Sequence, residues 1–478
     1  MIYLVTNQIT LFAEFTIISL EKSLELLEPL KIVGVDSETE GLDRFTKKML
    51  SLQLGNKDIQ IVLDLSTFGC KLPQSIIDYL QSDRLFIFQN AKFDLQFLYI
   101  FHCVPTKVYD TYLAEIILTN GLQYDGRGLD DLVHKYCPDG YMVKGMASEI
   151  VKYGMTPEAI KYAANDVVYL EDIMNAQMKQ VKYLHMETAI NIDNSFVKVL
   201  AYIEFCGIKL DTVKWQQKCE RDVDLSFERK LVINKWLIDN DFGEYFGTYD
   251  LFTGEPECII NWDSPKQVIQ LFEKIGINCD KVDKGVKSKS CDAKTLEPQT
   301  HDFPIIPIYL EYKEAKLLVS TFGKTWFNHI SKVTGRIHTR FNQLMNTGRL
   351  SCGGKDKLSG TQWPNLQNLP KDQFTRSCFI SEPGYSYVCA DFSGQEQIVL
   401  ANVCQDKALL SFYQNGLTDM HSFVALLMYE DIRNDLGITD ILNITNDHLL
   451  IVKKKYSKFR TIAKSAGFAI NLYIFNKF

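Results

Sequence analysis

Two acidic residues stand two positions apart at the end of a short apolar stretch. The segment Lys31–Glu38 reads KIVGVDSE, which is typical of a strand. Asp36 and Glu38 are expected on one face of it, because successive strand residues point to opposite faces. Two neighbouring carboxylates repel each other unless a positive charge lies between them. Mg²⁺ or Mn²⁺ would supply that charge, since both prefer oxygen ligands. The alternative is a pair of solvated acids at a strand end.

Two later segments carry further acids on predicted helices. A second predicted strand, RLFIFQ, leads into a helical segment that begins near Asn90 and carries Asp94 one turn later. Further along, Thr156 is followed by Pro and Glu, which is a strong helix start. That helix places Tyr162 and Asp166 one turn apart on one face. Each of these acids could be incidental by itself.

In order and spacing, these acids and the tyrosine resemble the three motifs of the DEDD exonuclease superfamily, Tyr subtype. The resemblance implies that two divalent ions assist hydrolysis of the 3′-terminal phosphodiester. By this resemblance Asp36 would bridge the ions, and Glu38 and Asp166 would complete their coordination. Asp94 would be held mainly through water, and Tyr162 would orient the attacking water. Single-stranded 3′ ends would be the substrate.

A second candidate cation ligand follows another apolar run. Tyr387–Ala390 predicts a buried strand, which ends at Asp391 and a Ser-Gly turn before a helix that begins at Gln395. A carboxylate at the mouth of a buried strand is well placed to hold a hard cation. The alternative is an ordinary turn at a strand end.

Charge is unevenly distributed along the chain. Lys and Arg number 52 against 59 Asp and Glu, so the formal net charge is −7. Between Tyr309 and Arg376, however, 11 Lys and Arg face 4 Asp and Glu. A basic segment in an acidic chain favours a track for phosphates. The alternative is a solvated helix face.

Four separated stretches, TGRLS, PNLQNLP, DFSGQE and RTIAKSAGF, resemble in sequence and order the motifs of the family A, DNA polymerase I-like enzymes. The resemblance implies primer–template DNA and dNTPs as partners, with two Mg²⁺ (or Mn²⁺) ions per active site. It makes Asp391 the first palm carboxylate. It also implies a nucleotide site formed by Glu396, His421, Arg460, Lys464 and Phe468. The implied DNA contacts are Arg349, Asn365, Gln367 and Asn368.

These resemblances together predict an α/β and α+β fold. A ribonuclease H-like exonuclease domain with a mixed sheet is expected over residues 1–185, a helical thumb over 186–335, and a partial palm with the start of the fingers over 336–478. No 5′-nuclease domain is expected before the exonuclease, which suits a phage-type or organellar-type member.

The sequence after Asn471 departs from the family pattern, in which a Tyr-Gly pair and a later His-Asp motif follow. We therefore expect a C-terminally truncated replicative polymerase with proofreading. Exonuclease activity and DNA binding are expected alone, and polymerisation only if a second polypeptide completes the palm. The rival hypotheses are a stand-alone 3′–5′ exonuclease and a non-catalytic DNA-binding remnant.

Composition excludes several other classes. The 12 cysteines are scattered without C-x-x-C pairs or zinc-ligand spacing, which argues against a disulfide-rich secreted protein or a zinc protein. No apolar run reaches membrane-spanning length, so no membrane partner is expected. We expect a cytoplasmic protein, in the host cytoplasm if it is phage-encoded.

Overall fold

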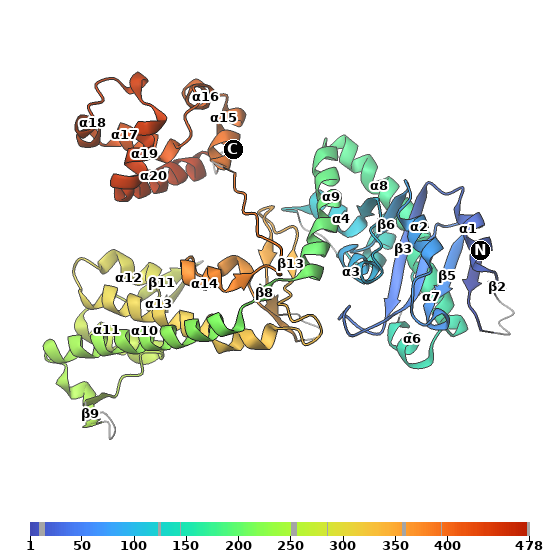
Figure 1. Cartoon of the computed structure of the whole chain (residues 1–478), viewed down its shortest axis with the longest axis horizontal. Coiled ribbons are helices and arrows are strands. Elements are labelled where there is room, and N and C mark those ends of the chain that lie inside the picture. Colours follow the sequence, from blue (N-terminus) through green and yellow to red (C-terminus); the bar gives the residue numbers. More distant parts are fainter. Residues whose placement is uncertain are drawn as a thin grey trace. The chain divides into compact units, whose positions relative to one another are not determined.

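The computed structural model describes residues 1–8, 15–122, 126–143, 145–249, 256–283, 285–355, 360–392 and 394–475. The chain forms two compact units, Met1–Tyr385 and Ser386–Phe478, which are described separately below (Figure 1). Among the described residues, no helix combines the length and the apolar character that crossing a membrane requires.

A mixed sheet forms the N-terminal part of the first unit, as expected from the sequence. The described strands lie in the order β2-β1-β5-β4-β3-β6-β7 (Figure 1). Strand β3 is antiparallel to β4 and parallel to β6, so it joins the two parts of the sheet. The strands are β1 (Ile2–Val5), β2 (Thr16–Ile17), β3 (Ile32–Thr39), β4 (Met49–Gly55), β5 (Gln60–Asp64), β6 (Leu85–Phe88) and β7 (Lys107–Asp110).

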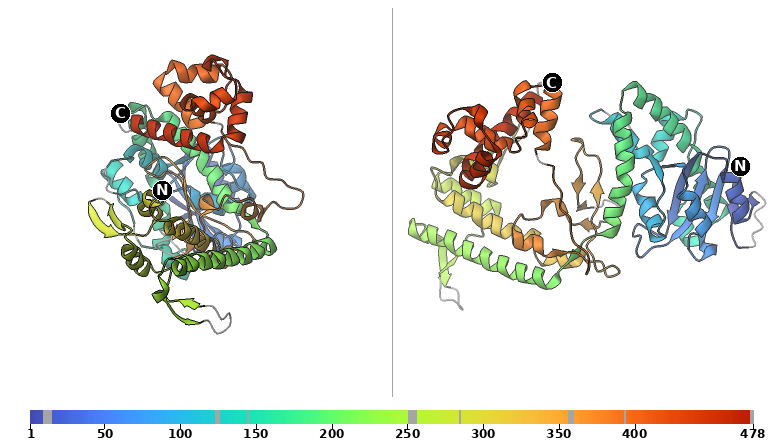
Figure 2. Two further views of the ribbon diagram at one scale, coloured as in Figure 1. Left: turned by 90° about the vertical axis from the view of Figure 1, so that its left-hand side faces the viewer. Right: turned by 45° about the horizontal axis from the view of Figure 1, so that its top comes forward.

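Helices cover both faces of this sheet, as the views in Figure 2 show. Val33 and Val35 of β3 are fully buried in a core that includes apolar residues of α3. The opposite face of β3 lies against α7, where Gly34 meets the backbone of Val167. The helices of this region are α1 (Leu20–Leu27), α2 (Gln74–Leu80), α3 (Lys92–Ile100), α4 (Thr111–Thr119), α5 (Leu129–Tyr136), α6 (Ala147–Tyr153), α7 (Pro157–Val168) and α8 (Leu170–Tyr183).

The rest of the first unit is built around two long helices, α10 (Thr212–Asp239) and α13 (Ile305–Thr321), which pack side by side (Figure 1). Lys218 and Asp222 form a fully buried ion pair of 2.7 Å within α10. The other helices are α9 (Glu187–Cys206), α11 (Pro265–Ile275), α12 (Ala293–Leu296) and α14 (Gln373–Ser377). The short strands are β8 (Lys209–Leu210), β9 (Phe246–Tyr249), β10 (Pro256–Cys258), β11 (Asp280–Asp283), β12 (Val286–Lys289), β13 (Phe341–Asn342), β14 (Ser351–Cys352), β15 (Gly354–Lys355), β16 (Gln362–Trp363) and β17 (Phe379–Ile380).

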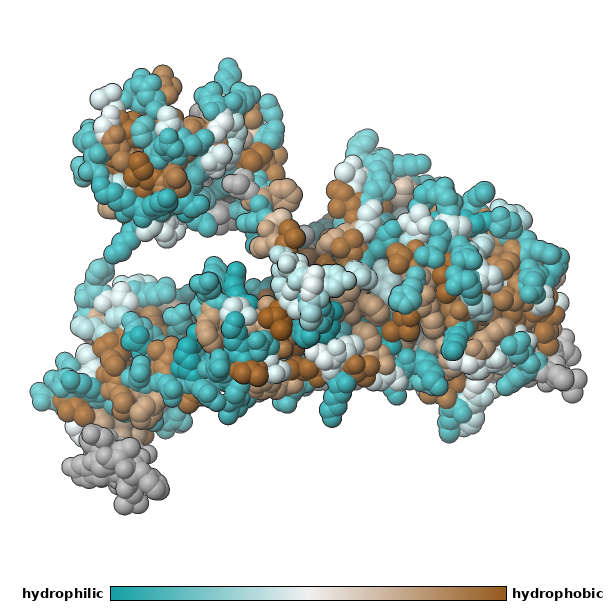
Figure 3. Space-filling view, in the orientation of Figure 1, coloured by the Kyte–Doolittle hydropathy of each residue, from teal (hydrophilic) through white to brown (hydrophobic). Residues whose placement is uncertain are grey.

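The second unit is helical wherever its described residues form regular structure. Its core includes Ala425, Leu426, Val452 and Ala463, all of which are fully buried. The surface seen in Figure 3 mixes hydrophilic and hydrophobic residues on both units. The helices are α15 (Gln395–Cys404), α16 (Lys407–Gln414), α17 (Met420–Met428), α18 (Glu430–Asp435), α19 (Asn446–Lys455) and α20 (Ser457–Phe475).

Candidate functional site

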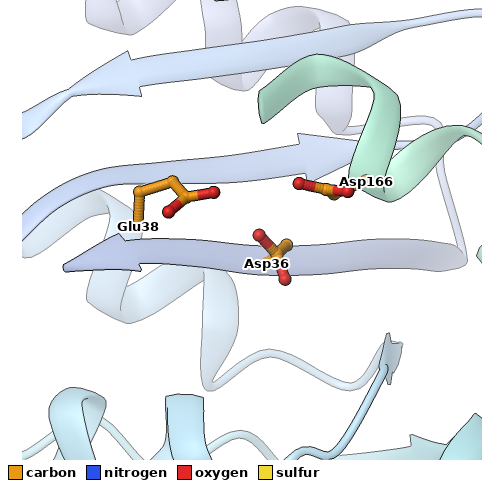
Figure 4. Close-up of side chains that lie close together, drawn as sticks. All are labelled: Asp36, Glu38 and Asp166. Atoms are coloured by element: carbon orange, nitrogen blue, oxygen red, sulfur yellow. The ribbon is translucent and has the colours of Figure 1, made fainter. Parts of the chain in front are cut away.

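Three carboxylates converge where β3 meets α7. Asp36 and Glu38 extend from β3, and Asp166 extends from α7 toward them (Figure 4). One carboxylate oxygen of each lies within 4.8 Å of the others. Glu38 and Asp166 are buried, whereas Asp36 is half-buried and so remains reachable from solvent. The structure thus brings together residues that are more than a hundred positions apart in the sequence, as the resemblance to the DEDD motifs implies.

Asp94 lies beside this group, on the first turn of α3. Its side chain is only 3% exposed, and its Oδ1 accepts a hydrogen bond of 2.5 Å from the Ser37 hydroxyl. Ser37 stands between Asp36 and Glu38 on β3 and projects to the other side of the strand. Asp94 therefore adds a fourth negative charge near the site, outside the group of three whose oxygens could share one ion.

Burial and mutual repulsion make these carboxyl groups hard to ionise. Burial raises the pKa of Glu38 to about 7 and that of Asp94 to about 7. Burial, followed by the nearby negative charges of Asp166, Asp94 and Glu38, also raises the pKa of Asp36. A set of oxygen donors that repel one another suits a hard divalent cation, which would relieve the repulsion. The residues present therefore fit the divalent metal that nuclease and polymerase domains use.

Tyr162 extends from α7 at the same site. Its hydroxyl donates a hydrogen bond to the Glu38 carboxylate, which lowers the pKa of Glu38 against the larger effect of burial. Burial, reinforced by the negative charge of Asp166, raises the pKa of Tyr162, so the hydroxyl stays protonated. Helix α7 begins as predicted, with the Thr156 hydroxyl accepting a 3.2 Å hydrogen bond from Ala159 N.

The predicted start of the helix that carries Asp94 is wrong by two residues. Helix α3 begins at Lys92, and Asn90 lies before it with a left-handed φ of 62°. Asparagine tolerates this conformation better than most residues. The backbone N–H groups of Asn90 and Ala91 each donate a 2.9 Å hydrogen bond to the buried carboxylate of Asp110. Asn90 therefore shares no helix face with Asp94.

The predicted DNA contacts lie in the second half of the first unit. Asn365 caps the short 3₁₀ helix Leu366–Asn368, because its Oδ1 accepts hydrogen bonds from Gln367 N and Asn368 N. These three polar residues, Asn365, Gln367 and Asn368, line a groove of about 900 Å³. Arg349 is not among the groove's lining residues and lies on an exposed turn, where its carbonyl accepts from Met345 N.

Four of the five predicted nucleotide-binding residues cluster in the second unit. Arg460 on α20 forms two hydrogen bonds, of 2.9 and 3.1 Å, with the Asp419 carboxylate that caps α17. Burial lowers the pKa of His421, and the positive charges of Arg460 and Lys464 add to the effect. The negative charge of Glu396 acts on the same imidazole in the opposite direction. Phe468 belongs to α20, but its side chain lies outside the described residues.

The buried strand predicted over Tyr387–Ala390 is wrong. These residues are exposed and belong to no described strand, and the Val388 side chain is 92% exposed. A strand needs a neighbouring strand and a covering layer, and none of the described strands lies beside this segment. Asp391 is exposed as well, and among the described residues it belongs to no group of three or more possible cation ligands.

Two family models match separate parts of the chain. A family model described as "3'-5' exonuclease" matches residues 15–182, and one described as "DNA polymerase family A" matches residues 251–436. The chain belongs to the family A DNA polymerases. Its exonuclease match covers all four carboxylates of the first site.

The relatives of this chain extend beyond the region of similarity. It is 26% identical over 438 residues to DNA polymerase I of Borreliella burgdorferi, covering 87% of this chain and 44% of that protein. It is 25% identical over 431 residues to the Aquifex aeolicus enzyme, covering 85% and 65%. The chain thus spans roughly half to two thirds of these relatives. The POL domain of Pol1 from M. smegmatis, solved with DNA primer-template and dNTP, shares its fold with a TM-score of 0.62, 20% identity and coverage of 95% and 70%.

Two contributors to the polymerase's first site were missed at the sequence level. Ser37 holds Asp94, and its position between two predicted ligands was an available signal. Gly34 lets α7 approach β3 closely, because a Cβ there would lie 2.9 Å from Val167 O and 3.1 Å from Gly55 O. A glycine inside an apolar strand is itself a signal of close backbone approach.

Replacing Gly34 by Ala is expected to separate α7 from β3 and so move Asp166 away from Asp36. The added methyl group should lower the free energy of unfolding by about 1–3 kcal/mol and slow any reaction at the site. Urea unfolding and the nuclease rate measure the two effects. Gly243→Ala, whose added Cβ meets nothing within 4 Å, should change neither. Wild-type values for Gly34→Ala would contradict the close packing described here.

Proposed function

We propose that this chain is the proofreading and DNA-binding part of a replicative DNA polymerase, acting in the cytoplasm, and that it hydrolyses single-stranded DNA from the 3′ end. The convergence of Asp36, Glu38 and Asp166, with Asp94 beside them, supports the nuclease most strongly. Membership of family A supports the polymerase assignment.

In the proposed nuclease reaction, Asp36, Glu38 and Asp166 would hold two Mg²⁺ or Mn²⁺ ions. Bound ions of this kind stabilise charge on the attacking oxygen and on the leaving 3′ oxygen. Asp94, fixed by Ser37, adds negative charge beside the ligands. Tyr162 remains a hydrogen-bond donor at neutral pH, and we propose that it orients the attacking water.

For synthesis, we propose that Asn365, Gln367 and Asn368 contact the duplex across their groove, with Arg349 at the primer–template junction. His421, Arg460 and Lys464 would contact the triphosphate of a dNTP, with Phe468 under its base and Glu396 excluding a 2′-hydroxyl. Asp391 would bind the ions that activate the primer end. Asp391 belongs to no described group of three or more possible cation ligands, and we propose that synthesis needs a further carboxylate, supplied by a second polypeptide.

The test is a 5′-labelled oligonucleotide incubated with the purified chain and Mg²⁺, first single-stranded and then as a primer annealed to a template with dNTPs. Shortening of the single strand supports the nuclease, and extension of the primer supports the polymerase. Shortening without extension favours a nuclease that acts alone. A shifted band that is neither shortened nor extended would overturn both activities and leave a DNA-binding protein.

Replacing Tyr162 by Phe removes only the hydroxyl that donates to Glu38. We expect the single-turnover rate of shortening to fall by about 10–100-fold while oligonucleotide affinity is unchanged, because the water loses its orienting group. Tyr153→Phe, at an exposed position on neighbouring α6, is the matched control and should keep the wild-type rate. An unchanged rate in Tyr162→Phe would remove Tyr162 from the mechanism.

A further inference from the structure

Glu204, near the end of α9, lies at the centre of a buried polar network in the first unit. Its side chain is 3% exposed. Its Oε1 accepts a 2.7 Å hydrogen bond from Lys92 Nζ, and its Oε2 accepts one of 2.6 Å from Gln96 Nε2. Lys92 and Gln96 are one turn apart on α3, so the two carboxylate oxygens of Glu204 bind side chains on one face of that helix. Asp94, between them in sequence, points to another face and reaches Ser37.

The same network anchors the loop that follows the metal-binding strand. Helix α9 ends at Cys206, so the Glu204 carbonyl has no partner within the helix. Arg44 Nη2, in the loop after β3, donates a 2.6 Å hydrogen bond to this carbonyl. His338 Nδ1 donates a second one, of 2.9 Å. One residue therefore holds both the helix that carries Asp94 and the loop that follows Glu38.

A third segment joins the network from the polymerase half of the unit. Phe341 N donates a 2.6 Å hydrogen bond to Glu204 Oε1, and Lys92 Nζ also donates to the Phe341 carbonyl. Phe341 begins β13, which leads into the turn that carries Arg349. The position of α3, and with it Asp94, thus depends on a segment more than two hundred residues away.

We propose that Glu204 is a positioning residue for the nuclease: it holds α3 so that Asp94 reaches the cation site, and it ties that geometry to the segment that leads to the primer–template contacts. This proposal rests on the nuclease function proposed above. The hydrogen bonds described above join Glu204 to α3, to the loop after β3 and to the His338–Phe341 segment, and none of them reaches the three grouped carboxylates. The effect of Glu204 should therefore appear in turnover and in cation binding, while substrate affinity is preserved.

Glu204→Gln is the decisive variant, because it keeps the size of the side chain but places an amide N–H₂ against the donors of Lys92 or Gln96. We expect kcat on a single-stranded oligonucleotide to fall about tenfold or more, with KM within about twofold of wild type. We also expect the Mn²⁺ dissociation constant, measured by electron paramagnetic resonance on the full chain, to rise about threefold or more, since Asp94 adds negative charge to the site.

Asp222→Asn is the matched control, because it also removes the carboxylate of a buried ion pair, in α10, outside the nuclease fold. It should lose stability but keep kcat and Mn²⁺ affinity. If Glu204→Gln fails to fold, Gln96→Leu takes its place. It removes the hydrogen bond from Gln96 to Glu204 Oε2 and should lower kcat about threefold. The proposal is overturned if kcat or Mn²⁺ affinity is unchanged in Glu204→Gln, or in Gln96→Leu where that variant replaces it. It is also overturned if Asp222→Asn loses as much kcat and Mn²⁺ affinity. A wild-type chain that does not shorten DNA overturns the proposed function instead, and Mn²⁺ affinity then decides the role of Glu204.

Discussion

Replacing Asp36 by Asn should slow 3′→5′ shortening by about 10³-fold or more, which corresponds to roughly 4 kcal/mol in activation free energy. Asp36 is the carboxylate on which the charges of Asp166, Asp94 and Glu38 all act, so it lies at the centre of the cation site. The asparagine has nearly the same shape but cannot balance the charge of a divalent ion. Shortening of a labelled oligonucleotide under single-turnover conditions gives the rate.

The same variant should be more stable than wild type when EDTA removes divalent ions. Asp36 repels its neighbours in the metal-free protein, so its neutral replacement relieves that repulsion. Lost activity with gained stability is the signature of a residue kept for binding rather than for folding. Asp83→Asn, which removes an exposed carboxylate paired with Lys107, should keep the wild-type rate. Full activity in Asp36→Asn would refute the cation site.

Without divalent ions, the nuclease domain should lose stability as the pH rises from about 5 to about 8. Glu38 has a pKa of about 7 in the folded protein, against an ordinary value of 4.5. Between these values the unfolded chain has lost the proton that the folded protein still holds, so raising the pH favours unfolding. Glu38 alone should account for about 3 kcal/mol, at 1.36 kcal/mol per pKa unit. The stability is present below pH 4.5 and is lost by the time the pH passes about 7.

All five tryptophans lie between Trp215 and Trp363, so tryptophan fluorescence does not report on the sheet that carries Glu38. Urea unfolding read by pulse proteolysis, followed by the loss of fragments that contain β3, reports on that sheet directly. Glu38→Gln should flatten the pH dependence and raise stability at pH 8 in EDTA. At pH 8, added Mn²⁺ should restore the stability of the wild-type protein but should stabilise Glu38→Gln much less. A wild-type profile that is flat or rises with pH would contradict the repulsion.

Local signals in the sequence, combined with the resemblance to the DEDD motifs, predicted that Asp36, Glu38 and Asp166 lie together. Alternation along β3 put Asp36 and Glu38 on one face, and the Thr156 cap located α7, which carries Asp166. Each of these signals spans only a few residues. The support around Glu204 could not be predicted in this way, because its partners Lys92 and Phe341 are each more than a hundred residues distant in sequence.

The strand predicted at Tyr387–Ala390, which the structure does not contain, illustrates the opposite failure. An apolar run predicts burial only if another part of the chain supplies the hydrogen-bonding edge and the covering layer. Here the local pattern is that of a strand, but the described residues offer neither. The composition of a segment therefore indicates that it could form a strand, but strands elsewhere in the chain determine whether it does.

That exposed stretch also affects how the purified protein behaves at high concentration. Val388 is 92% exposed and Phe392 is 78% exposed on backbone that belongs to no described strand. Exposed apolar residues on such backbone offer a template for pairing between molecules. We expect concentrated solutions to become turbid through this stretch, and Val388→Lys to keep them clear.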